Sequence, residues 1–306
     1  MLINTREVSK TILKFRERKE RYKMDGNFVI TGFSDEISQN VEQQFEHLNK
    51  LGIKYFEPRG IDGKNISELN GDEVKSLKEK MTKYGISVSS IGSPIGKIGI
   101  NDDFSAHMDL LSNMIEIAKT LGTKYIRVFS FFMPEGEKPE KYRGEVIYRM
   151  KEMTKLAEKN GITLLHENEK NIYGDIAPRC LEILEAVGSE SLRAVFDPAN
   201  FVQCGQEVYP QGYELLKDYV VYVHIKDALP DGSVVPAGFG AGNVKEVLRA
   251  LKQRGYKGFL SLEPHLGSFK GLENLEIDDK MTSLEGSTPE KFTLAYDSLM
   301  NILNQI

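Results

Sequence analysis

A repeating pattern of apolar and polar residues runs along the chain beyond Gly26. In each unit, helically spaced apolar residues end at a glycine, and a short β-branched or aromatic run follows. The instances are LGIKYFE from Leu51, YGISVSS from Tyr84, LGTKYIR from Leu121, NGITLLH from Asn160, VGSESLRAVF from Val187 and RGYKGFLSLE from Arg254. Glycine suits the left-handed position that ends a helix, and each apolar run suits a buried parallel strand. The pattern therefore predicts helices that alternate with parallel strands.

The spacing of these units predicts eight strands. The six glycines lie 33, 37, 39, 27 and 67 residues apart, and the longest interval holds one more strand, YVVYVHIKD from Tyr219. FVITGF from Phe28 supplies the first strand. A closing helix follows Thr288 and Pro289, with an apolar stripe at Phe292, Tyr296, Leu299 and Leu303. Eight such units predict an α/β fold, a closed (β/α)8 TIM barrel. An open doubly wound sheet is the structural alternative, but the first strand lacks a G-x-G-x-x-G turn.

Two segments fall outside the repeat. Residues 1–25 form a basic extension in which Val8, Ile12, Phe15 and Tyr22 have helical spacing, so we expect an extra N-terminal helix before a catalytic domain at 26–306. Residues 267–286 follow the last strand and are acidic without clear periodicity, and we interpret them as a lid over the catalytic face.

Composition narrows the class of protein. Hydrophobic residues make up 40% of the 306, but no apolar run approaches the ~20 residues of a membrane span. The two cysteines have no disulfide or metal-site spacing, which favours a cytoplasmic location. The net charge is −5, and beyond Lys23 it becomes −10, from 32 basic and 42 acidic residues. This sign disfavours a nucleic-acid partner, and a homo-oligomer is compatible with the composition.

In a (β/α)8 barrel, the chemistry lies at the carboxyl ends of the strands. The last four strands end in TLLHENE, RAVFDPAN, VVYVHIKD and FLSLEPH. Glu167, Asp197, His224 and Glu263 each lie two residues beyond an inward-facing position, at Leu165, Val195, Tyr222 and Ser261, so all four should point to the barrel axis.

Three carboxylates and a histidine without cationic partners from the same strands would repel one another in a buried pocket. A single divalent metal ion resolves this conflict. Oxygen-rich ligation with one imidazole favours Mn²⁺, Mg²⁺ or Co²⁺, and Zn²⁺ is also allowed.

These motifs resemble the xylose isomerase-like TIM barrel superfamily of sugar phosphate isomerases and epimerases. The resemblance extends from Phe28 onward and is most specific at HENE around Glu167, FDPANF around Asp197, HIKD at His224 and LEPH around Glu263. It implies that these four residues bind the ion, and that Glu167 and Glu263 also act as catalytic acid and base on an enediolate. Many relatives have histidines where this chain has Glu169 and Asn200, so the substrate contacts of those histidines do not carry over.

Residues at or just beyond the other strand ends are candidates for substrate binding. They are Glu57, Arg59, Lys97, Arg127, Asn200 and Lys226. The four cations suit a carboxylate or phosphate, but pairing with nearby acids such as Glu57 or Asp227 is equally compatible. The run GFGAG from Gly238 offers backbone amides to a phosphate, although glycine loops are commonly simple turns. His166 and His265 adjoin the ligands but are expected to point away from them.

The sequence thus predicts a metal-dependent sugar or sugar phosphate isomerase or epimerase that transfers protons through an enediolate. One alternative is a metal-dependent dehydratase or lyase of a cyclitol or sugar acid, similar to inosose dehydratase. A non-catalytic sugar-binding barrel is a second. The apurinic endonuclease branch of the superfamily is disfavoured, because the ends YFEPRG, SSIGSP and IRVFSF contain no histidine for further zinc ions.

Overall fold

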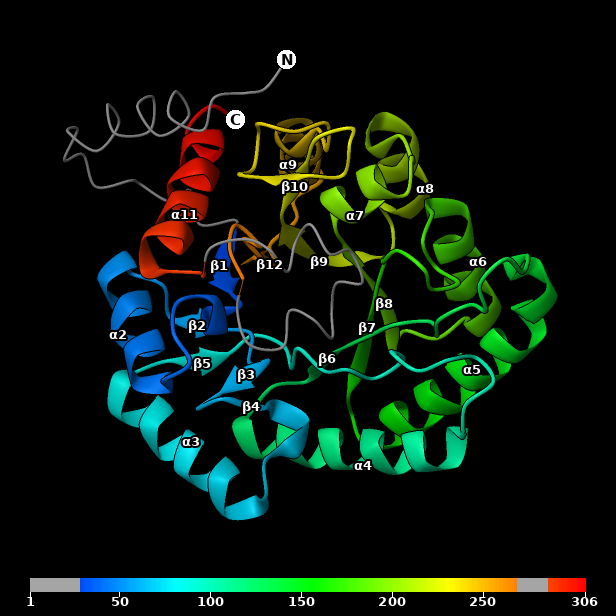
Figure 1. The fold of residues 1–306 in the computed structure, drawn as a ribbon, viewed down its shortest axis with the longest axis horizontal. Helices are drawn as coiled ribbons and strands as arrows, with labels where there is room; N and C mark the ends of the chain where they lie inside the picture. Colours follow the sequence, from blue (N-terminus) through cyan, green and yellow to red (C-terminus); the bar gives the residue numbers. More distant parts are fainter. Residues whose placement is uncertain (1–27, 269–285) are drawn as a thin grey trace.

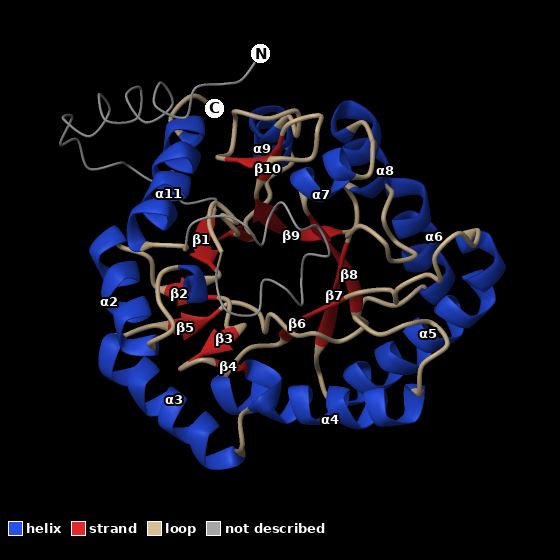
Figure 2. Ribbon diagram, viewed as in Figure 1, coloured by secondary structure: helices blue, strands red, loops and turns tan. Residues whose placement is uncertain are grey.

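The described part of the chain forms a barrel of parallel strands surrounded by helices (Figures 1 and 2). The computed structural model describes residues 28–268 and 286–306. The barrel strands are β1 (Val29–Gly32), β2 (Tyr55–Phe56), β5 (Ser87–Val88), β6 (Tyr125–Val128), β7 (Thr163–Glu167), β8 (Leu192–Phe196), β9 (Val220–Ile225) and β12 (Phe259–Leu262). All eight coincide with predicted strands. The predicted helix at 1–25 and nearly all of the predicted lid at 267–286 lie outside the described residues.

Helices form the outer ring. They are α2 (Val41–Leu51), α3 (Gly71–Tyr84), α4 (Phe104–Leu121), α5 (Arg143–Lys159), α6 (Ala177–Val187), α7 (Pro198–Gln203), α8 (Tyr213–Leu216), α9 (Val244–Gln253) and α11 (Pro289–Leu303). Two short hairpins, β3 (Gly60–Ile61) with β4 (Lys64–Asn65) and β10 (Asp227–Ala228) with β11 (Val234–Val235), decorate the loops. None of the described helices is long and apolar enough to cross a membrane.

Backbone pairing closes the barrel. Six strands form one parallel sheet in the order β1-β12-β9-β8-β7-β6, and β2 pairs with β5. The Glu57 amide donates to the Gly32 carbonyl at 2.9 Å, which joins β2 to β1, and a parallel bridge between Ile91 and Ile126 joins the segment after β5 to β6. The closed-barrel prediction is therefore confirmed over the open sheet.

The six glycines of the repeat end helices in the left-handed conformation, as the sequence predicts. Gly52, Gly85, Gly122, Gly161, Gly188 and Gly255 all have φ between 64° and 85° at the ends of helices, a conformation that costs side-chain-bearing residues free energy. Thr288 caps α11 as the sequence indicates, and its hydroxyl accepts from the Lys291 amide. The glycines thus set where each helix stops and the next strand begins.

Inward-facing side chains fill the barrel below its open end. Leu165, Val195 and Tyr222 form a small apolar cluster that is separate from the main core between sheet and helices. These are three of the four positions predicted to face inward. The next inward positions along the same strands then lie at the carboxyl end of the barrel.

One glycine after the third barrel strand should be far more sensitive to substitution than the helix-ending glycines. Gly96 has φ +88°, and a Cβ there would lie 2.0 Å from the Phe129 carbonyl oxygen, whereas a Cβ at Gly52, φ +77°, would meet nothing within 4 Å. We expect Gly52→Ala to lower the free energy of unfolding by about 1 kcal/mol, the cost of the left-handed backbone alone. Gly96→Ala should cost roughly 3 kcal/mol, because the Phe129 backbone must also move. Equal urea-unfolding midpoints for the two variants would contradict this packing.

Candidate metal centre

Four predicted ligands meet at the carboxyl ends of neighbouring strands. Glu167 ends β7, Asp197 follows β8, His224 lies in β9 and Glu263 follows β12. All four are at most 3% exposed, and one potential ligand atom from each lies within 4.8 Å of the others. His224 Nδ1 lies 2.9 Å from Glu167 Oε1, 3.2 Å from Glu263 Oε2 and 3.9 Å from Asp197 Oδ2. The structure therefore brings the predicted set together around the imidazole.

Cations lie inside this cluster, contrary to the sequence-based expectation. Lys226, two residues after His224 in the chain, places Nζ 3.0 Å from Glu263 Oε2 and 3.2 Å from Asp197 Oδ2. Arg127 reaches Glu167 Oε2 at 3.2 Å from β6, the neighbouring strand. The expectation that the carboxylates lack cationic partners from the same strands is thus wrong, because Lys226 follows β9, which lies between β8 and β12, and pairs with the carboxylates that follow both neighbours.

Burial and charge pull the pKa values of the cluster in different directions. Burial raises the pKa of Asp197 to about 7, although Lys226 opposes the shift. Burial acts in the same direction on Glu263, but Lys226 and the two nearby histidines outweigh it and hold its pKa well below the usual value. Burial disfavours the charged form of His224, yet Glu167, Glu57 and Glu263 raise its pKa well above the usual range. Near neutral pH the cluster therefore holds protons on His224 and, in part, on Asp197.

The donor set fits a divalent cation. Glu167 Oε2 and Asp197 Oδ2 are buried and make no hydrogen bond, because their contacts with Arg127 and Lys226 are ion pairs without hydrogen-bond geometry. Buried polar atoms in proteins are almost always satisfied, so these oxygens retain lone pairs for a further partner. A cation would also replace the charge now supplied by the protons on His224 and Asp197.

The other predicted site residues divide between the cluster and its surroundings. Asn200 donates from Nδ2 to Glu167 Oε1 at 3.3 Å and from its backbone to Asp197 Oδ1 at 2.9 Å, so it holds two predicted ligands in place. Lys97 pairs with Glu169 at 3.3 Å and lies over the Phe129 ring. Arg59 pairs with Asp35 at 2.8 Å rather than with Glu57.

Glu57 lies below the cluster. Its Oε2 accepts from the Tyr222 hydroxyl at 2.8 Å and the Ser261 hydroxyl at 2.7 Å, and it lies 3.4 Å from His224 Nε2. Glu57 and its hydroxyl partners therefore form a polar layer between the apolar cluster inside the barrel and the predicted ligands.

Three residues near Glu263 were not among the predicted site residues. Asp35 and Glu36 follow β1, where the position alone, at the end of a barrel strand, could have indicated them. His265 was expected to point away, but its Nε2 lies 3.3 Å from Glu263 Oε1. Because His265 lies two residues after Glu263, strand alternation places both side chains on the same side, so the expectation that His265 points away is wrong.

The glycine loop from Gly238 binds an internal anion. The amides of Gly238 and Gly240 donate to Asp227 Oδ2 at 2.9 and 3.0 Å, and the Gly242 amide donates to Oδ1 at 2.8 Å. A Cβ at Gly240 would lie 2.3 Å from Asp227 Oδ1, so the close approach requires glycine. The carboxylate of the chain itself therefore occupies the position proposed for a phosphate.

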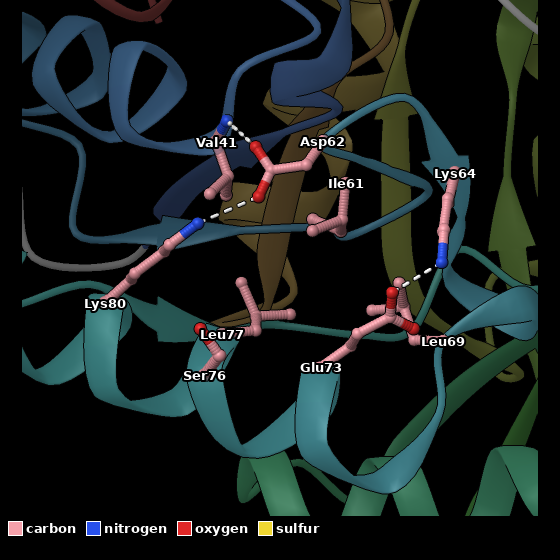
Figure 3. Close-up of a pocket in the computed structure, with 9 residues that line it drawn as sticks. All are labelled: Val41, Ile61, Asp62, Lys64, Leu69, Glu73, Ser76, Leu77 and Lys80. Atoms are coloured by element: carbon pink, nitrogen blue, oxygen red, sulfur yellow. Dashed lines mark hydrogen bonds and ion pairs between the residues drawn. The ribbon is translucent and has the colours of Figure 1, made fainter.

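A hollow outside the barrel contains no comparable cluster. It lies between α2, the β3–β4 hairpin and α3 (Figure 3). Its charged groups pair with one another: Lys80 with Asp62 at 2.8 Å and Lys64 with Glu73. The barrel mouth is therefore the stronger candidate for chemistry.

Known proteins are similar to this chain in sequence and in structure. Among curated proteins, an inosose isomerase from Halalkalibacterium halodurans is 22% identical over 241 residues, which cover 74% of this chain and 83% of that protein. Among solved structures, a D-tagatose 3-epimerase-like protein superposes with a TM-score of 0.71 at 18% identity, over 91% of this chain and 98% of that one. The IOLI protein, solved with a bound zinc atom, gives a TM-score of 0.70 at 19% identity over 91% and 99%.

A family model supports the same assignment. The model described as xylose isomerase-like TIM barrel matches residues 45–284, which include all four predicted metal ligands. With this match over most of its length and the eight-stranded barrel described above, the chain belongs to the xylose isomerase-like TIM barrel family.

Proposed function

We propose that this protein is a divalent-metal-dependent sugar isomerase or epimerase that transfers protons through an enediolate. The observation that carries the proposal is the buried convergence of Glu167, Asp197, His224 and Glu263, with two oxygens that lack hydrogen bonds. Relatives named as isomerases and epimerases support this class of reaction.

These four residues would hold the ion. Mn²⁺, Mg²⁺ and Co²⁺ suit the carboxylate-rich set, and Zn²⁺ remains a candidate because the IOLI neighbour binds zinc. When bound, such an ion polarises a carbonyl and stabilises negative charge that develops on its oxygen.

Glu167 and Glu263 are suited to move protons. They come from β7 and β12, which are separated in the sheet by β8 and β9, so they can address different sides of one substrate. Arg127 beside Glu167 and Lys226 beside Glu263 favour the ionised carboxylates, which are the forms that accept a proton. One carboxylate removes the proton next to the carbonyl, and the other returns a proton to the opposite face or to the neighbouring carbon.

The paired charges at the barrel mouth favour an uncharged sugar or cyclitol as the substrate over a phosphate ester. Asp227 fills the amides of the glycine loop. In the described part of the chain, the four cations proposed for substrate binding each pair with a carboxylate: Arg59 with Asp35, Lys97 with Glu169, Arg127 with Glu167, and Lys226 with Glu263. A phosphate would have to displace one of these buried partners, at a cost in free energy.

Metal content tests the first part of the proposal. We expect about one tightly bound divalent ion per chain after dialysis against Mn²⁺, because the described residues supply one complete ligand set. Chelation should reduce turnover by at least about a hundredfold. Elemental analysis that finds two or three tightly bound ions per chain would contradict the mononuclear site.

Solvent exchange tests the proton transfer. Turnover in D₂O should place deuterium on the carbon next to the carbonyl, because a carboxylate that removes this proton exchanges it with water. Glu263→Gln should lower the exchange rate by roughly a thousandfold, and metal content measured alongside separates lost chemistry from lost metal. Product without solvent deuterium would argue against a carboxylate base that exchanges with solvent, and loss of water from the substrate would favour the dehydratase.

Substrate charge gives a third test. We expect kcat/KM for ketoses or inososes to exceed that for the matching phosphate esters by at least about tenfold, because a phosphate must displace a buried carboxylate from its cation. NMR of each uncharged compound and its ester with added Mn²⁺ measures this ratio. A preference for the esters would show that an anion site exists and would overturn the interpretation of the four cations.

A further inference from the structure

The two ring nitrogens of His224 have different surroundings. Nδ1 faces Glu167 and Glu263 at 2.9 and 3.2 Å, so it is the nitrogen directed at the predicted ion. Nε2 points the other way, is buried, and makes no hydrogen bond, and Glu57 Oε2 lies 3.4 Å from it. A buried N–H without a hydrogen-bond acceptor costs about 1–3 kcal/mol. A protonated Nε2 of His224 therefore needs an acceptor nearby.

Glu57 is built into the barrel as a buried acceptor. It follows β2, is 1% exposed, and receives the hydroxyls of Tyr222 and Ser261 on Oε2, while its Oε1 makes no hydrogen bond. Among the ion pairs of the described residues, the partner of Glu57 is His224. At 3.4 Å the two atoms are close enough for an ion pair, and a hydrogen bond would need a shorter and better aligned contact.

The His224 ring is fixed in other directions by packing. Phe33 meets it edge-on at 5.2 Å between ring centres, and Tyr222 does so at 5.8 Å. With the ring plane held in this way, protonation decides whether Nδ1 can act as a ligand, since a nitrogen that carries a proton has no lone pair to donate.

We propose that Glu57 is a positioning residue for the metal centre, which accepts the Nε2 proton of His224 and thereby leaves Nδ1 as the ligand atom. The inference rests on the proposed metal-dependent function. It assigns to Glu57 a role behind the ligand instead of the substrate contact expected from its place at a strand end. Carboxylates that hold the second nitrogen of a metal-bound histidine typically strengthen metal binding by 10- to 100-fold.

The Zn²⁺ affinity of the metal-free protein, measured by competition with a chromogenic chelator, tests this role. Glu57→Gln should weaken binding by about 10- to 100-fold. The matched control is Glu169→Gln, which removes a buried carboxylate that pairs with Lys97, and it should change affinity by less than about fivefold. Tyr222→Phe removes a hydrogen bond from the same polar layer but keeps the Glu57 carboxylate, so it should lower thermal stability with a much smaller effect on affinity.

Nitrogen NMR of the zinc-loaded wild-type protein with labelled histidine gives a readout that needs no Glu57 variant. The chain has five histidines, and His224→Gln assigns the relevant signal. The ring should carry its proton on Nε2, with Nδ1 bound to zinc. A proton on Nδ1, or equal affinities for Glu57→Gln and Glu169→Gln, would overturn the inference while leaving metal binding intact. Failure of the wild-type protein to bind any divalent ion would instead overturn the proposed function together with the inference.

Discussion

Charge balance at the open end of the barrel constrains every other feature of the site. Seven buried carboxylates gather there (Asp35, Glu36, Glu57, Glu167, Glu169, Asp197 and Glu263) against four Lys and Arg side chains (Arg59, Lys97, Arg127 and Lys226). Each unpaired buried charge costs several kcal/mol, so this excess must be neutralised. Protons on His224, His265 and Asp197 do so in part, as their raised pKa values indicate. A divalent ion would supply the same charge at the centre of the cluster, where the carboxylates converge.

The order of the barrel strands determines which carboxylates lie close enough together to share a positive charge. The strands are staggered, because Glu167 pairs with Val195 and His224 with Ser261. Potential ligand atoms of Glu167, Asp197, His224 and Glu263 still lie within 4.8 Å of one another, and the inward positions two residues earlier hold Leu165, Val195 and Tyr222. Lys226 and Arg127 then take up a double role, because they lower the cost of the buried carboxylates and keep Glu167 and Glu263 ionised. The same pairing engages the positive charge of Arg127 and Lys226 within the cluster.

The eight strands and the four predicted ligands could be found from the sequence because both follow simple periodicities. Glycine ends the helices, and side chains alternate along the strands up to Glu167, Asp197, His224 and Glu263. The remaining contacts depend on geometry that no periodicity carries. Lys226, just after β9, reaches Asp197 at the end of the adjacent strand β8, and Asp227 folds back on the glycine loop. Glu57 was recognised as a strand-end residue, but its place behind His224 depends on the opposite wall of the barrel.

We propose that the buried carboxylate cluster is a metal centre whose histidine ligand binds through Nδ1. Diffraction from crystals grown with Mn²⁺, with data collected at the manganese absorption edge, tests this most directly because the anomalous signal locates the ion without reference to activity. We expect one anomalous peak at the barrel mouth, in contact with Glu167, Asp197, Glu263 and Nδ1 of His224. A peak elsewhere on the barrel, no peak at a cluster still held together by Lys226, or contact through Nε2 of His224 would contradict it.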